Sequence, residues 1–173
     1  MAQIFEERWT QWVAMTTTVL AVCAAISALR GSSNSTKAQL ATTEETNMWS
    51  YFQSKSIKQH ACELHLDTLK LHLAEATNPE VRQYIEKQIT VCEADIARYD
   101  GEKGEIKTQA ESVASQENDF KRHSASFGMA AMLLQIGIMM SSVSALLKKK
   151  PMWVVGLGFG VIGLGYMAYG FIW

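Results

Sequence analysis

Three long stretches of this chain contain no charged side chain. They run from Trp9 to Leu29, from Ser124 to Leu147 and from Pro151 to Trp173. A helix needs about 20 apolar residues to cross the hydrocarbon core of a bilayer, and each stretch is long enough. All but six of the 33 Lys, Arg, Asp and Glu residues lie between Arg30 and Arg122. The sequence therefore predicts an all-α membrane protein with three transmembrane helices and a polar region between the first and the second.

This segregation of charge divides the chain into five predicted parts. Trp9 and Trp12 mark the membrane entry, where amphipathic rings are stable. Glu6 and Glu7 stand where a signal peptide would carry basic residues, so we expect an uncleaved anchor. The predicted parts are the N-terminus with transmembrane helix 1 (1–29), an extramembrane region (30–126), transmembrane helix 2 (127–147), a basic turn (148–151) and transmembrane helix 3 (152–173).

The extramembrane region carries the signals of two long helices. Gly, Ser, Asn and Thr cluster within Arg30–Lys37, which predicts a turn-rich link before a helix from about Ala38 to Ala76. Asn78 and Pro79 predict a break, with Asn as the cap and Pro in the first turn of the next helix. Two glycines, Gly101 and Gly104, interrupt that second helix, and we expect a weak point there rather than a loop.

Apolar residues in both helices recur at alternating spacings of three and four, as in a coiled-coil seam. The first helix carries two adjacent stripes, one of Ile57, Ala61, Leu64 and Leu71 and the other of Cys62, Leu66, Leu69 and Leu73. The second helix carries one seam from Val81 to Phe120. With a tight turn between them, the helices are expected to form a long antiparallel coiled-coil-like hairpin in which Cys62 and Cys92 face each other. One partner helix cannot cover the apolar surface of both stripes, so we expect the first helix to associate with a further copy of the chain.

The orientation follows from the basic turn Lys148–Lys150. It is short, so the positive-inside rule places it in the cytoplasm and the extramembrane arm outside.

Small residues share a helix face in two of the apolar segments. One row comprises Gly156, Gly160 and Gly163, and the other comprises Thr17, Ala21 and Ala25. Such rows allow close approach of helices in lipid, so we expect helix-packing or oligomer interfaces. Gln135 is polar near the middle of its segment, where its side chain could line a pore or bond another helix. We favour a hydrogen bond to another helix over a pore lining, because no acidic or basic side chain accompanies Gln135 in the segment.

The polar residues form no recognisable catalytic set. His60, Glu63 and Asp67 share a helix face and His65 and His72 share another, but no set of three or four metal ligands is complete. We therefore expect no metal, no cofactor and no enzymatic activity. The net charge of −1 disfavours nucleic acid as a partner, because phosphate binding requires a concentrated basic surface.

The stretch Trp49–Lys58 is the most distinctive in the chain and is the candidate interaction motif. Its candidate residues are Trp49, Tyr51, Phe52, Gln53, Lys55 and Lys58. Together with Trp12–Thr16, Glu102–Ala110, Leu134–Ile136 and the basic turn, it resembles the domain of unknown function 4337 family. The resemblance covers most of the chain and implies a helical membrane protein of bacteria. We expect it in the inner membrane. It implies no reaction.

These patterns favour a non-enzymatic structural or scaffold protein that is anchored in the lipid bilayer and self-associates through its helices into a homo-oligomer. The alternative is a channel or transport component, whose pore would be lined by Gln135, Ser141, Ser142 and Ser144 from several copies. A metalloenzyme that uses the arm histidines is the least favoured interpretation.

Overall fold

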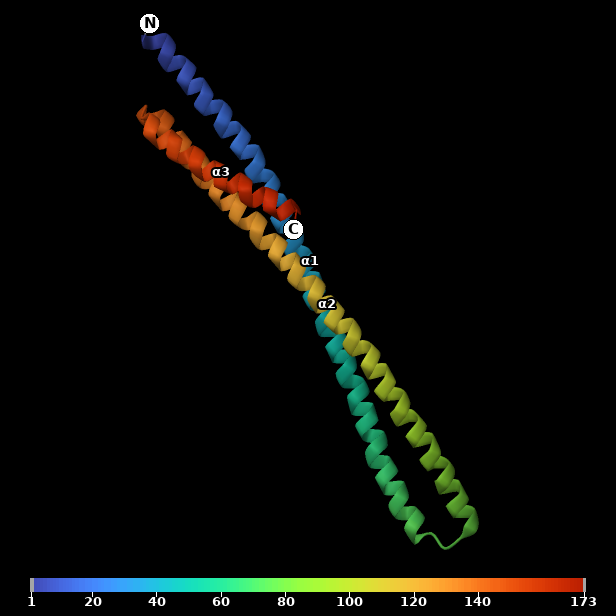
Figure 1. Ribbon diagram of the computed structural model, residues 1–173. Helices are drawn as coiled ribbons and strands as arrows, with labels where there is room; N and C mark the ends of the chain where they lie inside the picture. Colours follow the sequence, from blue (N-terminus) through green and yellow to red (C-terminus); the bar gives the residue numbers. More distant parts are fainter. Residues whose placement is uncertain (1, 173) are drawn as a thin grey trace. The chain divides into compact units, whose positions relative to one another are not determined.

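The computed structural model describes the backbone of residues 2–172 and the side chains of residues 9–172. Over that range α-helix is the only regular secondary structure, and residues 76–78 and 148–149 connect the helices. The three helices are α1 (Ala2–Glu75), α2 (Pro79–Leu147) and α3 (Lys150–Ile172) (Figure 1). Each contains a segment that is long and apolar enough to cross a membrane. The prediction of an all-α chain with three such segments is confirmed at this level.

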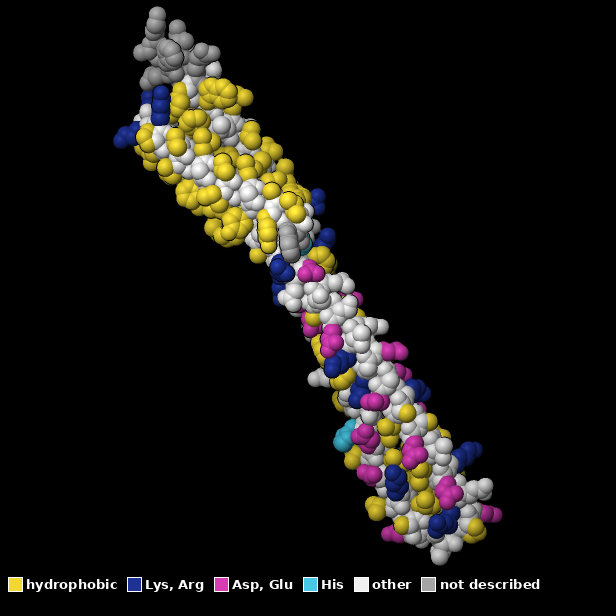
Figure 2. Space-filling view, viewed as in Figure 1, with side chains coloured by type: hydrophobic (Ala, Val, Ile, Leu, Met, Phe, Trp, Pro, Cys, Tyr) yellow, Lys and Arg dark blue, Asp and Glu magenta, His cyan; other side chains and the backbone are white. Residues whose placement is uncertain are grey.

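The chain divides into two compact units. Unit 1 comprises Met1–Gln39 and Glu117–Trp173, and unit 2 comprises Leu40–Gln116. On the face shown in Figure 2, hydrophobic side chains cover much of unit 1, whereas Lys, Arg, Asp and Glu are distributed over unit 2.

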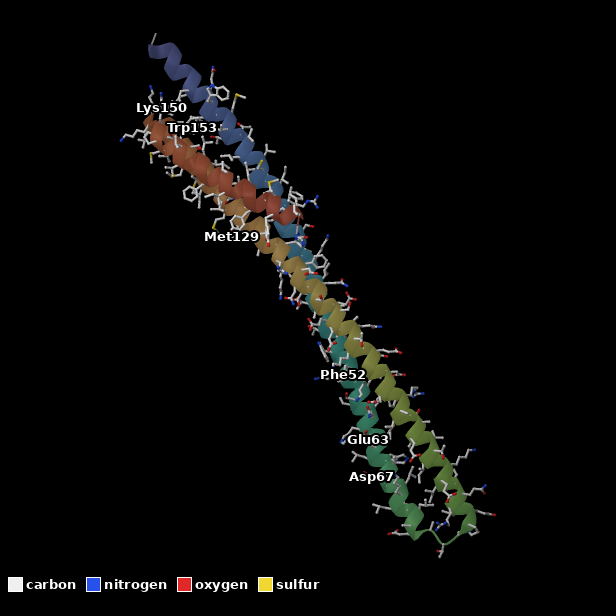
Figure 3. All side chains as sticks on the ribbon, in the orientation of Figure 1. Phe52, Glu63, Asp67, Met129, Lys150 and Trp153 are labelled. Carbon is white, nitrogen blue, oxygen red and sulfur yellow. The ribbon has the colours of Figure 1, made fainter. Side chains whose placement is uncertain are left out.

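Unit 1 is held together by close contacts between small residues. Gly137 of α2 and Gly156 of α3 approach so closely that a Cβ on Gly156 would lie 2.9 Å from the Gly137 carbonyl oxygen. A cluster of Leu20, Ala24 and Leu134 joins α1 to α2. The first turns of α3 also bond α1, because the Trp153 indole (labelled in Figure 3) donates to Thr16 Oγ1 at 3.2 Å.

The turn-rich link predicted at Arg30–Lys37 is wrong, because α1 continues through it without a break. Gly31 is buried, and a Cβ there would lie 3.4 Å from Phe127 Cβ. Its carbonyl oxygen accepts a 3.0 Å hydrogen bond from Ser124 Oγ of α2. Glycine destabilises a helix by only about 1 kcal/mol relative to alanine. Packing of Gly31 against α2 therefore outweighs this cost.

The connection between α2 and α3 is a two-residue turn closed by Ser144. The Lys149 amide donates to the Ser144 carbonyl at 3.2 Å, and Ser144 Oγ donates to the Lys149 carbonyl at 2.7 Å. Lys148 has a positive φ of 53°, in the place where such helix ends usually carry glycine.

The predicted break between the two long helices is present in unit 2. α1 ends at Glu75 and α2 begins at Pro79, and Asn78 Oδ1 accepts a hydrogen bond from the Glu80 amide at 2.9 Å. Arg82 covers the end of α1 by donating to the Ala76 carbonyl at 3.1 Å. α2 also continues through the two glycines at 101 and 104, as predicted.

Candidate interaction site

The candidate motif lies on α1 in unit 2, and part of it faces α2. Phe52 (labelled in Figure 3) and Lys55 are half-buried, whereas Trp49, Tyr51, Gln53 and Lys58 are exposed. The positions follow from helical geometry, because residues three and four apart share one face. The motif therefore has one side that packs within unit 2 and one side open to solvent.

The contact with α2 is centred on an ion pair. Lys55 Nζ lies 2.6 Å from Glu102 Oε2, and the Lys55 side chain is only 14% exposed. The same ammonium group lies 5.1 Å from the ring centroid of Tyr51 and 5.5 Å from that of Tyr99. A cation between two aromatic faces gains cation–π attraction in addition to the ion pair.

Charges around this pair extend the network along α2. Arg98 Nε lies 3.7 Å from Glu102 Oε1, and the Arg98 guanidinium lies 5.0 Å from the Tyr99 ring centroid. Lys103 lies 5.6 Å from the Phe52 ring centroid. Both helices thus contribute cations and rings to one cluster, defined here as the Lys55 cluster: Tyr51, Phe52, Lys55, Arg98, Tyr99, Glu102 and Lys103.

The electrostatics of the cluster favour the charged forms. The hydrogen bond from Lys55 holds the pKa of Glu102 below its usual value. The hydrogen bond to Glu102, and after it the bond to Tyr51, raises the pKa of Lys55. The Lys55–Glu102 pair is therefore ionised across the neutral range.

Sequence reasoning did not find the α2 half of this cluster. A usable signal was present, because Lys55 lies 23 residues before Asn78 and Glu102 lies 24 residues after it. Residues equidistant from a tight turn meet in an antiparallel pair. Burial, and after it the charge of Cys62, raises the pKa of the buried Cys92.

The arm histidines show little that resembles a metal centre. His60 Nδ1 lies 3.4 Å from Glu63 Oε2 on the same helix. Asp67, one turn beyond Glu63, is exposed on α1 (Figure 3). Among the described residues, no three His, Cys, Asp or Glu side chains converge on one point.

The small-residue rows of the apolar segments have different environments. Gly156, Gly160 and Gly163 are buried in unit 1, against Gly137, Leu20 and Leu134 respectively. Thr17 is half-buried and donates to the Val13 carbonyl, whereas Ala21 and Ala25 are exposed. The glycine row is therefore occupied by the chain's own helices, and the alanines are left on the surface.

Gln135 is exposed on α2, on the side away from the core of unit 1. Its amide forms no hydrogen bond within the described part of the chain. The favoured expectation, a bond to another helix, is therefore not met inside a single chain. Of the other candidate pore residues, Ser141 and Ser144 are buried and Ser142 is exposed.

Three apolar helical segments and a polar region with a charged and aromatic cluster define this chain as a helical protein that is compatible, by composition, with a membrane. The chain belongs to the domain of unknown function 4337 family, whose model matches residues 9–173. The resemblance found in the sequence is thereby confirmed. No curated protein and no solved structure matches the chain.

Proposed function

We propose that this protein is a non-enzymatic structural protein of the bacterial inner membrane that self-associates. In this proposal the three apolar segments cross the bilayer. Residues 30–126 form an antiparallel coiled-coil-like arm, and copies of the arm pair side by side.

The observation that carries the proposal is an apolar stripe on α1 that no described residue covers. Ile57, Leu64 and Leu71 are 70%, 57% and 69% exposed. Cys62 and Leu66, on the other stripe of the same helix, are half-buried and buried. The sequence predicted two stripes, and the structure leaves one of them open, on the side of α1 away from α2.

The spacing of this exposed stripe suits a second copy. Ile57, Ala61, Leu64, Thr68 and Leu71 follow each other at steps of four and three, which is the repeat of a coiled-coil seam. Copies anchored in one bilayer point the same way. Identical stripes can therefore meet in register about a twofold axis.

A second exposed stripe supports association within the membrane. Gly128, Met132, Gln135, Met139 and Ser142 are all exposed on α2 and also follow steps of four and three. An amide that faces lipid has no hydrogen-bond partner, whereas two amides from neighbouring copies can donate to each other. Gly128 allows close approach, since no described atom beyond its own stretch of helix lies within 4 Å of a Cβ placed there.

Light scattering of the full chain in mild detergent, with the detergent mass subtracted, tests the proposal. Wild type is expected to be an oligomer, and Leu64→Glu with Leu71→Glu is expected to shift it toward the monomer. His65→Glu with His72→Glu is the matched control, because it adds the same charges one position away on exposed sites. A monomeric wild type, or equal effects of the two pairs, would defeat the proposal.

Orientation is part of the proposal. The basic turn Lys148–Lys150 is placed in the cytoplasm and the arm outside. Single cysteines at Lys149 and Glu86, in a chain without its native cysteines, test this with a membrane-impermeant thiol reagent on intact cells. Labelling is expected at position 86 and not at 149, and the reverse result would invert the orientation.

The rival function is a channel or transport component. Its support is the exposed position of Gln135 and Ser142 on one stripe of α2, from which several copies could surround a pore. Conductance across bilayers reconstituted with the purified oligomer, lost on Gln135→Leu, would favour the channel over the structural protein.

A further inference from the structure

Cationic and aromatic side chains gather at one end of the apolar segments of unit 1. Arg30 ends the first uncharged stretch, and Arg122 and His123 precede the second. Phe171 lies near the end of α3, and the Arg30 guanidinium lies 5.6 Å from its ring centroid. This end of unit 1 is where the chain changes from apolar to polar.

A hollow of about 250 Å³ opens at this border, between all three helices. Arg30 and Asn34 line it from α1, and five other residues line it from α2 and α3: Phe120, His123, Phe127, Gly170 and Phe171. None of the lining residues is acidic. A neighbouring hollow of about 490 Å³ shares His123 and Gly170 with the first. It is lined by both Asp119 and Arg122, so its charged residues do not favour an anion.

The α1 side of the first hollow presents its polar groups in a row. Arg30, Asn34 and Lys37 are spaced by four and three, so they share one face of the helix. Lys37 Nζ lies 5.6 Å from the ring centroid of Phe120, which places this second cation beside the same hollow. Neither cation has a carboxylate within ion-pair distance in the described part of the chain.

The opposite side is apolar and fixed in place. Phe127 and Phe171 pack edge to face, with ring centroids 5.1 Å apart. His123 Nδ1 lies 3.2 Å from the Gly170 carbonyl oxygen, and because a carbonyl only accepts, this nitrogen carries the proton. The bond ties the end of α3 to α2, so the hollow has a preformed apolar wall.

We propose that Arg30, Asn34 and Lys37 bind the phosphate of an anionic phospholipid, whose acyl chains lie along the apolar surface beyond Phe127 and Phe171. The chemistry combines two cations and an amide donor for the phosphate oxygens with a hydrophobic wall for the chains. Basic hollows between helices at a membrane border suit such headgroups. This inference rests on the proposed membrane location, but not on self-association.

Lipid retention measured by native mass spectrometry tests the site. Full-length protein in mild detergent is titrated with phosphatidylglycerol or with phosphatidylcholine of the same acyl chains. Wild type is expected to bind phosphatidylglycerol more tightly. Arg30→Gln with Lys37→Gln is expected to weaken that binding by roughly tenfold to thirtyfold and leave phosphatidylcholine binding unchanged.

Lys149→Gln with Lys150→Gln is the matched control, because it removes the same charge from the other end of the apolar segments. Arg30→Lys keeps the charge and is expected to retain most of the preference for phosphatidylglycerol. Circular dichroism of each variant verifies its helix content. Equal weakening by the two Gln pairs, or no preference in wild type, would overturn the site.

Inorganic phosphate at millimolar concentration separates the two sources of the anion. It is expected not to displace the lipid, and displacement would show a site for free phosphate instead. Sedimentation of the protein with cell membranes separates this test from the proposed function. A protein that does not sediment contradicts the membrane location, whereas one that sediments without lipid preference contradicts only the site.

Discussion

Units 1 and 2 use the same element, the long α-helix, but hold their helices together differently. In unit 1 glycines allow close approach between helices, backbone to backbone at Gly137 and Gly156. In unit 2 side chains of α1 and α2 make the contact, through the Lys55 cluster and buried residues such as Leu66 and Ile106. In the proposed membrane location, lipid offers no hydrophobic driving force between the helices of unit 1, so small residues and close approach suit it. In the same proposal unit 2 lies in water, which does supply a hydrophobic driving force, so an apolar seam suits it.

The largest expected effect is on the glycine contact of unit 1. Gly156→Val is expected to destabilise unit 1 by about 3 kcal/mol or more, because its side chain would be forced against the backbone of α2. Gly158→Val is the control, since no atom lies within 4 Å of a Cβ at that position. Thermal unfolding in detergent measures both, and equal effects would remove the distinction between the two units.

The corresponding change in unit 2 is a cavity. Ile106 is 7% exposed, and Ile106→Ala is expected to lower the free energy of unfolding by about 2–3 kcal/mol. Val91→Ala, at an exposed position of α2, is the control and is expected to cost much less. Hydrogen exchange should locate the loss in residues 40–116. Faster exchange in unit 1 alone would contradict a seam confined to unit 2.

Stabilisation is expected from the two exposed glycines of α2. A Cβ at Gly101 or Gly104 would meet nothing within 4 Å. Replacing both by Ala is expected to raise stability by about 1–2 kcal/mol, because Ala loses less backbone entropy in a helix. Chemical denaturation measures the gain. No gain, or a loss, would show that α2 requires flexibility at these positions.

The smallest expected effect concerns the Lys55–Glu102 pair, which is partly exposed to solvent. Because the pKa of Glu102 is lowered, its stabilising contribution is present above the usual glutamate value of 4.5 and is lost as pH falls through the folded-state pKa. The pKa of Lys55 is raised, so its contribution is present below 10.5 and is lost as pH rises through the folded-state pKa.

Glu102→Gln is therefore expected to lower the unfolding temperature between about pH 5 and 9, with the difference vanishing in acid. Glu86→Gln, at an exposed site on the same helix, is the control. A difference that stays constant down to the lowest pH would show that Glu102 acts through packing rather than charge.

Local signals predicted the parts of the fold that local chemistry decides. The break at Asn78 and Pro79 was predicted because a capping amide and a proline suffice to define it. The helix through Gly31 was missed because its stability comes from Phe127 and Ser124, which are distant in sequence. The exposure of Leu64 was likewise not predictable. α1 carries two stripes of equivalent periodicity, and periodicity alone does not decide which of them packs against α2.

The most direct test of the proposed parallel association is a cysteine crosslinking scan in native membranes. Cys23, Cys62 and Cys92 are first replaced by Ala, and single cysteines are then placed from position 57 to 71. Copies anchored in one bilayer and paired in register bring identical positions together. Disulfide dimers are therefore expected at positions 57, 61, 64, 68 and 71, with little crosslinking at 59, 62 and 66. Crosslinking without this periodicity, or none in this range, would contradict the account.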